Sequence, residues 1–140
     1  MLAGARSQIM RLEPWEALAA LGRGAQLIDI RSDADRERDG VVAGSLHIPR
    51  TVLEWRLEPE SEWRNPHVGG LDAEIVLLCD HGCSSSLAAA MLVELGFGRA
   101  GDVVGGYEAW RRAGLPTIPA PSAQRRPGEL PGMGTPDGER

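Results

Sequence analysis

The sequence predicts one α/β domain built on a central, mainly parallel five-stranded sheet with helices on both faces. Short apolar runs alternate along the chain with segments of helical pattern, as in a parallel sheet whose strands are joined by helices. Residues 74–79 (Glu-Ile-Val-Leu-Leu-Cys) are apolar almost throughout, which indicates a central strand covered on both faces. A chain of 140 residues with 42% hydrophobic residues also suits a single compact domain.

The first strand is expected at residues 8–12, and the first helix follows it. Pro14 stands where the first helical residue is expected, because proline is common in the first turn of a helix. Gly22 ends the helical pattern. The apolar face of this helix is predicted to consist of Trp15, Leu18, Ala19 and Leu21.

Two further strands and a polar helix are expected next. Residues 26–30 form a short apolar run, typical of a buried strand, that is followed at once by charged residues. Ser32 is placed to cap a short surface helix, and Gly40 to end it. Residues 41–48 are predicted to form a third strand.

The middle of the chain is expected to hold a helix and a loop. Thr51 and Glu54 have the spacing of a capping box, which predicts a helix continuing to Leu57. Residues 59–70 are polar and interrupted by proline and glycine, so they are predicted to form a surface loop.

The clearest elements lie in the last third of the domain. The strand at 74–79 leads through a tight loop into a helix over 85–95, whose apolar residues nearly surround it and therefore predict burial. A brief strand at 102–104 and a closing helix at 106–113 complete the pattern.

These elements define three segments. Residues 1–9 are expected to be an N-terminal extension, and residues 10–118 the folded domain. Residues 119–140 are rich in proline, glycine, serine and arginine without periodicity, which predicts a disordered tail.

Composition excludes several classes of function. A net charge of −5 argues against a nucleic-acid partner, which would need a concentrated basic face. No apolar run approaches the roughly 20 residues of a membrane span, and no secretory signal precedes the domain, so a cytoplasmic protein without membrane contact is expected. Two cysteines four positions apart do not make a secreted disulfide framework, so their role is expected to be chemical.

Cys79 is the candidate nucleophile. It stands at the carboxyl end of the predicted central strand, where ligands bind in open parallel sheets, and just before a helix N-terminus. Backbone N–H groups and the helix dipole at such a position favour negative charge, and hence the reactive thiolate. The alternative from position alone is a buried cysteine without a chemical role, because free cysteine is among the most buried residue types.

Four segments, in order, resemble the rhodanese family. Residues 27–31 (Leu-Ile-Asp-Ile-Arg) are similar to its strand ending in Asp-x-Arg, with Asp29 as a structural residue. Residues 40–49 (Gly-Val-Val-Ala-Gly-Ser-Leu-His-Ile-Pro) are similar to its Gly-x-Ile-x-Gly-Ala-x-x-Ile-Pro motif. Residues 79–85 (Cys-Asp-His-Gly-Cys-Ser-Ser) match its active-site loop, and residues 102–116 its C-terminal signature.

The resemblance implies a sulfurtransferase without a cofactor. Cys79 would take a sulfane sulfur from thiosulfate or a low-molecular-weight persulfide and pass it to cyanide, a thiol or a thiol carrier protein. The resemblance places the backbone amides of the loop around this sulfur, with hydroxyl groups of the last two residues as further donors and helix caps. The loop residues that would bind the substrate are Asp80, His81, Gly82, Cys83, Ser84 and Ser85.

The loop departs from the family pattern at Ser84, where many members carry arginine. Arg31, Arg50 and Arg56 are the candidates to replace that cation at the anion site. His81 is either a proton donor to the leaving group or an exposed loop histidine. Cys83 either resolves the persulfide as a disulfide or points away from it.

Other functions weighed against sulfur transfer are less well supported. A metal site built on the two cysteines and His81 lacks a fourth ligand, so no metal is expected. The related dual-specificity phosphatases have arginine six positions after the cysteine, where this chain has Ser85. The remaining alternative is a catalytically weak binding or regulatory module with the same fold.

Overall fold

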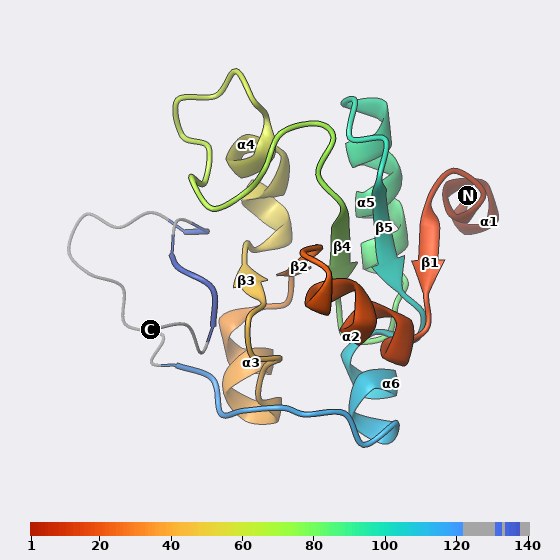
Figure 1. Cartoon of the computed structure of the whole chain (residues 1–140), viewed down its shortest axis with the longest axis vertical. Coiled ribbons are helices and arrows are strands. Elements are labelled where there is room, and N and C mark those ends of the chain that lie inside the picture. Colours follow the sequence, from red (N-terminus) through yellow and green to blue (C-terminus); the bar gives the residue numbers. More distant parts are fainter. Residues whose placement is uncertain (122–130, 133, 138–140) are drawn as a thin grey trace.

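The computed structural model describes residues 1–121, 131–132 and 134–137 and confirms the five-stranded α/β architecture (Figure 1). The strand order is β1-β5-β4-β2-β3, and every neighbouring pair is parallel. The central position of β4 confirms the prediction drawn from its apolar run. The strands are β1 (Met10–Leu12), β2 (Gln26–Asp29), β3 (Leu46–His47), β4 (Ile75–Leu78) and β5 (Ala100–Val103).

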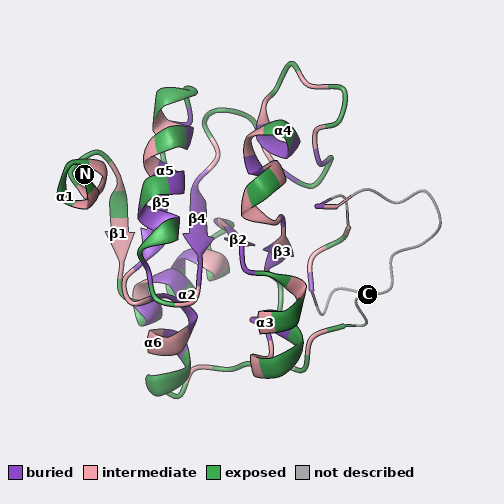
Figure 2. Cartoon of the chain, turned by 180° about the vertical axis from the view of Figure 1, so that it is seen from behind, coloured by how far each residue is buried: buried purple, intermediate pink, exposed green. Residues whose placement is uncertain are grey.

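Helices cover both faces of the sheet, as the sequence predicts. Helices α4 and α5 pack on one face, whereas α2 and α6 pack on the other (Figure 2). The helices of the described residues are α1 (Leu2–Arg6), α2 (Pro14–Gly22), α3 (Asp33–Asp39), the 3-10 turn η1 (Arg50–Val52), α4 (Leu53–Leu57), α5 (Ser84–Glu94) and α6 (Gly106–Arg112).

Strand β4 connects the two halves of the core. Ile75 and Leu77 pack on the side of α4 and α5, while Val76 and Leu78 pack on the side of α2 and α6. All four side chains are buried, and each contributes roughly 1.5–3 kcal/mol of transfer free energy. This packing fixes the carboxyl end of β4, where Cys79 follows.

The buried faces of two helices differ from the prediction. In α2 the buried residues are Pro14, Ala17 and Ala20, and Trp15 is 64% exposed. Small alanines let α2 lie close to the sheet, so Trp15 and Leu18 turn outward, while Leu21 is partly buried against the core. Helix α5 buries Ser85, Ser86, Ala88, Ala89 and Leu92 but exposes Leu87, Met91 and Leu95, because only one of its sides meets the sheet.

Two predictions for the middle of the domain are wrong in detail. The capping box at Thr51 and Glu54 does not form: a 3-10 turn comes first, and α4 begins at Leu53 without a side-chain cap. The strand predicted over 41–48 is reduced to β3, and Val41 instead pairs antiparallel with Ile118. The polar helix α3 is as predicted, with the Ser32 hydroxyl accepting from the Asp35 N–H at 3.1 Å.

Described segments near both termini pack against the domain. Helix α1, which the sequence analysis does not predict, lies beside β1 and α5 at one edge of the sheet (Figure 1). At the other edge the described residues of the predicted disordered tail differ from that expectation. Asp137 is buried and pairs with Arg36 and Ser45, and the Pro131 carbonyl accepts from Arg56. The rest of the predicted disordered tail (122–130, 133 and 138–140) lies outside the described residues.

Asp137→Ala is expected to lower the free energy of unfolding by about 1–3 kcal/mol, because it removes a nearly buried partner of Arg36. Urea unfolding of the full chain measures this. Asp72→Ala, at an exposed position, is the matched control and should change stability by less than about 0.5 kcal/mol. Equal, negligible effects of both substitutions would show that the tail contact does not stabilise the domain.

Candidate active site

Cys79 lies where the sequence analysis places it, between the end of β4 and the N-terminus of α5. Its thiol is free and only 7% of the residue is exposed. The N–H groups of Gly82 and Ser85 point at Sγ from 3.1 and 3.4 Å, and the thiol donates to the Ser85 hydroxyl oxygen at 3.2 Å. Two backbone donors and the positive end of a helix dipole therefore converge on one sulfur.

The N-terminus of α6 determines the course of the loop on its other side. The N–H groups of Tyr107 and Glu108 donate to the carbonyls of Cys79 and Asp80 at 2.8 and 3.0 Å. Gly106 permits this approach: a Cβ there would lie 2.4 Å from the Cys79 carbonyl oxygen. Gly105 and Gly106, at the start of α6, belong to the segment that resembles the family signature, and the close contact of Gly106 with the loop gives a physical reason for glycine there.

Two arginines from the N-terminal segment donate hydrogen bonds to the backbone of the active-site loop. Arg6 of α1 and Arg11 of β1 both donate to the Gly82 carbonyl, at 2.9 and 3.2 Å. In a trans peptide the C=O and the next N–H point in opposite directions, so fixing this carbonyl also fixes the direction of the Cys83 N–H. The sequence analysis missed both arginines, because each lies more than 70 residues from the loop along the chain.

A buried carboxylate lies beneath the loop, and the sequence analysis missed it as well. Asp102 of β5 is fully buried and accepts from the hydroxyls of Ser85 and Ser86 at 2.8 and 2.7 Å. Arg11 Nε pairs with its other oxygen at 2.9 Å. The helix-capping role predicted for the serine hydroxyls is wrong, because Cys83 is the N-cap residue of α5 and no side chain caps it.

Arg31 is the candidate cation that the structure brings to the site. It lines the pocket over Cys79, and its side chain is held by paired hydrogen bonds to Asp29 at 3.0 and 2.8 Å. It stacks on Tyr107, 3.8 Å from the ring centre. Burial works to lower the pKa of Arg31, but its hydrogen bond and charge interaction with Asp29 outweigh burial and raise the pKa.

One guanidinium nitrogen of Arg31 is left for a ligand. Its Nη1 is buried without a hydrogen-bond partner among the described residues and lies 4.0 Å from Asp80 Oδ1. An orphaned buried donor that lines the pocket with the nucleophile can donate a hydrogen bond to one oxygen of an anion.

The other two candidate arginines do not reach the pocket. Arg50 is half-buried and pairs with Glu54 at 2.6 Å. Arg56 lies under Trp55 and donates to the carbonyls of Pro131 and Trp63, so its role is structural. Burial lowers the pKa of Arg56. Among the three candidates, only Arg31 lines the site.

The pocket over Cys79 has a volume of about 250 Å³. His81 is 72% exposed at its rim and pairs with Glu108 at 2.8 Å, and Cys83 is exposed and free. The described residues contain no cluster of three or more His, Cys, Asp or Glu arranged to hold a metal ion. The lining residues are Ile30, Arg31, Cys79, Asp80, His81, Cys83 and Ser84.

Asp80 sets the charge at the mouth of this pocket. Burial first, and then its hydrogen bond and charge interaction with Asp35, raise the pKa of Asp80 against the opposing effects of Arg31 and His81. Asp80 therefore stays neutral to a higher pH than an ordinary aspartate. As the pH rises through this pKa, a negative charge forms beside Arg31.

Asp80→Asn is expected to lower the KM for an anionic donor such as thiosulfate by about threefold at neutral pH, because it removes that charge. The wild-type KM should rise as the pH increases through the raised pKa of Asp80, and the Asp80→Asn KM should rise less. Steady-state kinetics at fixed ionic strength measures both. A variant whose KM follows the wild-type curve throughout would contradict this role.

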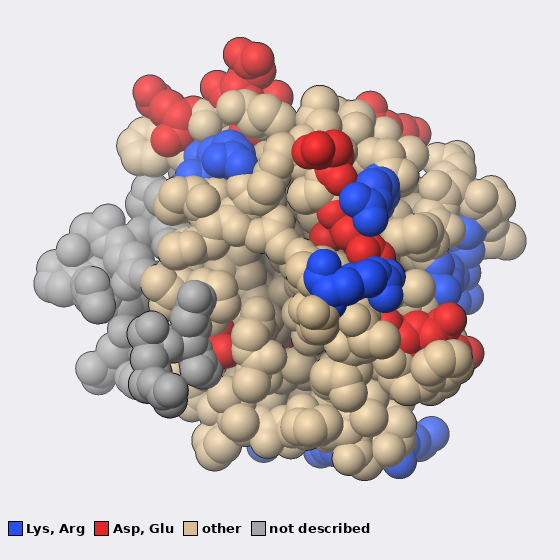
Figure 3. Space-filling view, in the orientation of Figure 1, with Lys and Arg blue, Asp and Glu red and all other residues tan. Residues whose placement is uncertain are grey.

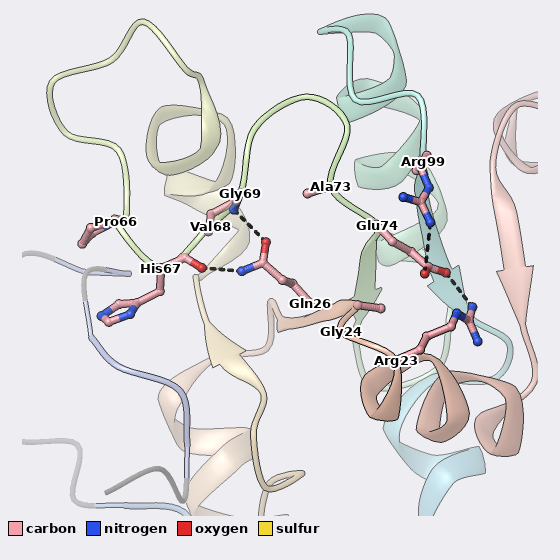
Figure 4. Close-up of a pocket in the computed structure, with 11 residues that line it drawn as sticks. Arg23, Gly24, Gln26, Pro66, His67, Val68, Gly69, Ala73, Glu74 and Arg99 are labelled. Atoms are coloured by element: carbon pink, nitrogen blue, oxygen red, sulfur yellow. Dashed lines mark hydrogen bonds and ion pairs between the residues drawn. The ribbon is translucent and has the colours of Figure 1, made fainter.

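A second hollow of about 470 Å³ lies at the opposite, amino-terminal edge of the sheet (Figure 4). Arg23 and Arg99 line it, but both already pair with Glu74, and both Gln26 amide atoms are used by loop backbone. Arginine and acidic side chains are likewise intermingled on the face shown in Figure 3. This hollow offers no nucleophile and no unpaired cation, so the pocket over Cys79 is the candidate site.

The chain is similar to proteins of one known family. The sequence model of the rhodanese-like domain family matches residues 13–113. A thiosulfate sulfurtransferase GlpE from Pseudomonas fluorescens strain Pf-5 is 34% identical over 86% of this chain and 98% of its own length. The GlpE of Pseudomonas savastanoi pv. phaseolicola is 36% identical over 75% and 90%.

Two solved structures extend the comparison. A protein of unknown function from Rhodopseudomonas palustris CGA009, described as a possible tyrosine phosphatase, is 33% identical with a TM-score of 0.77 over 84% of this chain and 90% of its own. A human single-domain sulfurtransferase is 27% identical with a TM-score of 0.63 over 75% and 96%. In addition, no helix among the described residues is long and apolar enough to cross a membrane.

Proposed function

The chain belongs to the rhodanese-like domain family of sulfurtransferases, and on this premise we propose that Cys79 carries a sulfane sulfur as a persulfide. The observation that carries the proposal is the convergence of the Gly82 and Ser85 amides on Cys79 Sγ at the floor of a pocket. These donors suit a thiolate before the reaction and a persulfide anion after it.

The proposed cycle has two displacement steps at sulfur. The Cys79 thiolate attacks the sulfane sulfur of the donor and a new S–S bond forms. The donor's own bond to that sulfur breaks, and sulfite or a thiolate leaves with the electron pair. In the second step cyanide or a thiol attacks the outer sulfur, and the Cys79 thiolate leaves. The oxidation state of the protein is therefore restored in each turnover.

Arg31 supports the binding of an anionic donor. Its unpartnered Nη1 lines the pocket and can donate to an oxygen of thiosulfate, in place of the loop arginine that Ser84 replaces. Only one donor nitrogen is free, and Asp80 lies beside it. A singly charged persulfide therefore suits this site better than the dianion thiosulfate. The protein would work in the cytoplasm, where thiols stay reduced.

Two other functions are less well supported. A phosphatase would need an arginine at the end of the loop to grip phosphate, and the buried hydroxyl of Ser85 stands there instead. A pure binding module would not need the amide donors around Cys79.

The test supplies the purified full chain with cyanide and, separately, thiosulfate or glutathione persulfide, and measures thiocyanate. p-Nitrophenyl phosphate is assayed in parallel. We expect turnover with both sulfur donors, a higher kcat/KM with the persulfide, and no phosphate release. Phosphate release without thiocyanate would favour the phosphatase, and the absence of both products would favour the binding module.

A further inference from the structure

The hydrogen bonds beneath the loop have a direction that bears on the protonation of Cys79. Ser85 has one hydroxyl proton, and it is donated to Asp102 Oδ2 at 2.8 Å. Its oxygen can then only accept from Cys79, 3.2 Å away, which requires the sulfur to carry its proton. The buried carboxylate therefore favours the thiol over the thiolate.

The Asp102 charge acts in the same direction. It lies two hydrogen bonds from Sγ in a buried setting, where a like charge disfavours ionisation. Arg11 offsets part of this charge by pairing with both carboxylate oxygens, at 2.9 and 3.3 Å. Ser86, which also accepts from Arg6 Nε, donates to the same carboxylate but makes no hydrogen bond to the sulfur in the described part of the chain.

Other charged or titratable groups also face this pair. On the pocket side these are Arg31, Asp80 with its partner Asp35, His81 with its partner Glu108, and Cys83. None of them contacts Asp102 in the described structure, so substitutions at Asp102 can be compared at each pH with these groups unchanged.

We propose that Asp102, acting through the Ser85 hydroxyl, favours the protonated thiol of Cys79 and so slows sulfur loading, because the thiolate is the form that attacks the donor. To ionise, Cys79 loses its proton to water and the Ser85 hydroxyl turns from Asp102 to Sγ, while Ser86 and Arg11 keep the carboxylate paired. The thiolate then attacks a hydropersulfide R–S–SH: the Sγ–S bond forms, the R–S bond to that sulfur breaks, and the leaving thiolate takes up a proton. The effect on sulfur loading rests on the proposed sulfur transfer, whereas the effect on the thiol does not.

The test follows alkylation of Cys79 by iodoacetamide from pH 5 to pH 10, by intact-protein mass, in full chains carrying Cys83→Ser. Asp102→Asn should move the profile about one pH unit toward acid, which is roughly tenfold faster alkylation below the midpoint. Arg11→Gln leaves the Asp102 carboxylate in place but removes its arginine partner, so the alkylation profile should move toward alkaline pH. Asp72→Asn, at an exposed position, is the control and should stay within about twofold of the parent.

Unchanged or alkaline-shifted alkylation in Asp102→Asn would overturn the proposal. If Asp102→Asn does not fold, Arg11→Gln serves as the test in its place. An unchanged or acid-shifted alkylation profile in Arg11→Gln would then overturn the proposal. In a Ser85→Ala background the effect of Asp102→Asn should fall to less than half, because the connecting hydroxyl is gone. A full effect there would show that the charge acts without Ser85.

Sulfur loading is measured separately. Below the midpoint of the alkylation profile, Asp102→Asn should load faster from thiosulfate and from glutathione persulfide, and unchanged loading from both would contradict the effect on sulfur transfer. If no variant loads from either donor while the alkylation profiles still shift, the proposed function fails but the role of Asp102 on the thiol stands.

Discussion

Cys79→Ser should abolish thiocyanate formation from either donor, a loss of at least about 1000-fold in kcat/KM. A serine hydroxyl is not ionised at neutral pH and cannot form a persulfide, so the covalent route is closed. The substitution is nearly isosteric in a site whose contacts to Sγ come from Gly82 and Ser85, so the fold should remain. Steady-state thiocyanate assays and thermal unfolding measure the two effects.

Cys83→Ser is the matched control for this loss. Cys83 is exposed at the rim of the pocket, and in the structure it is not bonded to Cys79. Turnover should therefore stay within about threefold of wild type. A large loss in Cys83→Ser would show that this cysteine takes part, as a resolving thiol would. Residual turnover in Cys79→Ser above about 1% would place the sulfur carrier elsewhere.

Gly106→Ala is expected to have the largest effect on stability. A Cβ at this position would lie 2.4 Å from the Cys79 carbonyl oxygen and 2.7 Å from the Asp80 backbone, neither of which can give way without moving the loop. The backbone also has φ of 65°, which costs an alanine about 1–2 kcal/mol by itself. We expect a loss of about 3 kcal/mol or more in the free energy of unfolding, with sulfur transfer lost as well.

Gly114→Ala separates the two causes. Gly114 has a similar φ of 73°, but a Cβ there would meet nothing within 4 Å. It should cost about 1–2 kcal/mol and leave turnover unchanged. Urea unfolding of both variants gives the comparison. Equal costs would mean that backbone conformation alone explains Gly106 and that α6 does not shape the loop.

The parts of the fold that could be predicted are those with a local signal. The apolar run of β4 identified the central strand, and Ser32 with Gly40 marked both ends of α3. The faces of α2 and α5 could not be predicted from apolar periodicity. Their small residues face the sheet, and which side is covered depends on distant elements.

The same division holds for the site. Cys79 and the amides around it follow from a strand, a loop and a helix that are contiguous in sequence. Asp102, Arg6 and Arg11 act on the loop from elements 71 to 80 residues away or from a different strand, so no spacing rule could bring them together. Arg56 was a candidate to replace the missing loop cation if its segment folded toward the loop, but it contacts Trp55 and two carbonyls in a buried structural role.

The central claim is that Cys79 carries one sulfur atom as a persulfide. The mass of the intact protein tests this claim most directly. Wild type and Cys79→Ser are each incubated with thiosulfate or glutathione persulfide, and their intact masses are measured by mass spectrometry. The proteins are then treated with cyanide, and the masses are measured again. A gain of about 32 Da, the mass of one sulfur, should appear on wild type, be absent from Cys79→Ser, and disappear with cyanide. An equal gain on both proteins, or none on wild type with either donor, would contradict the account.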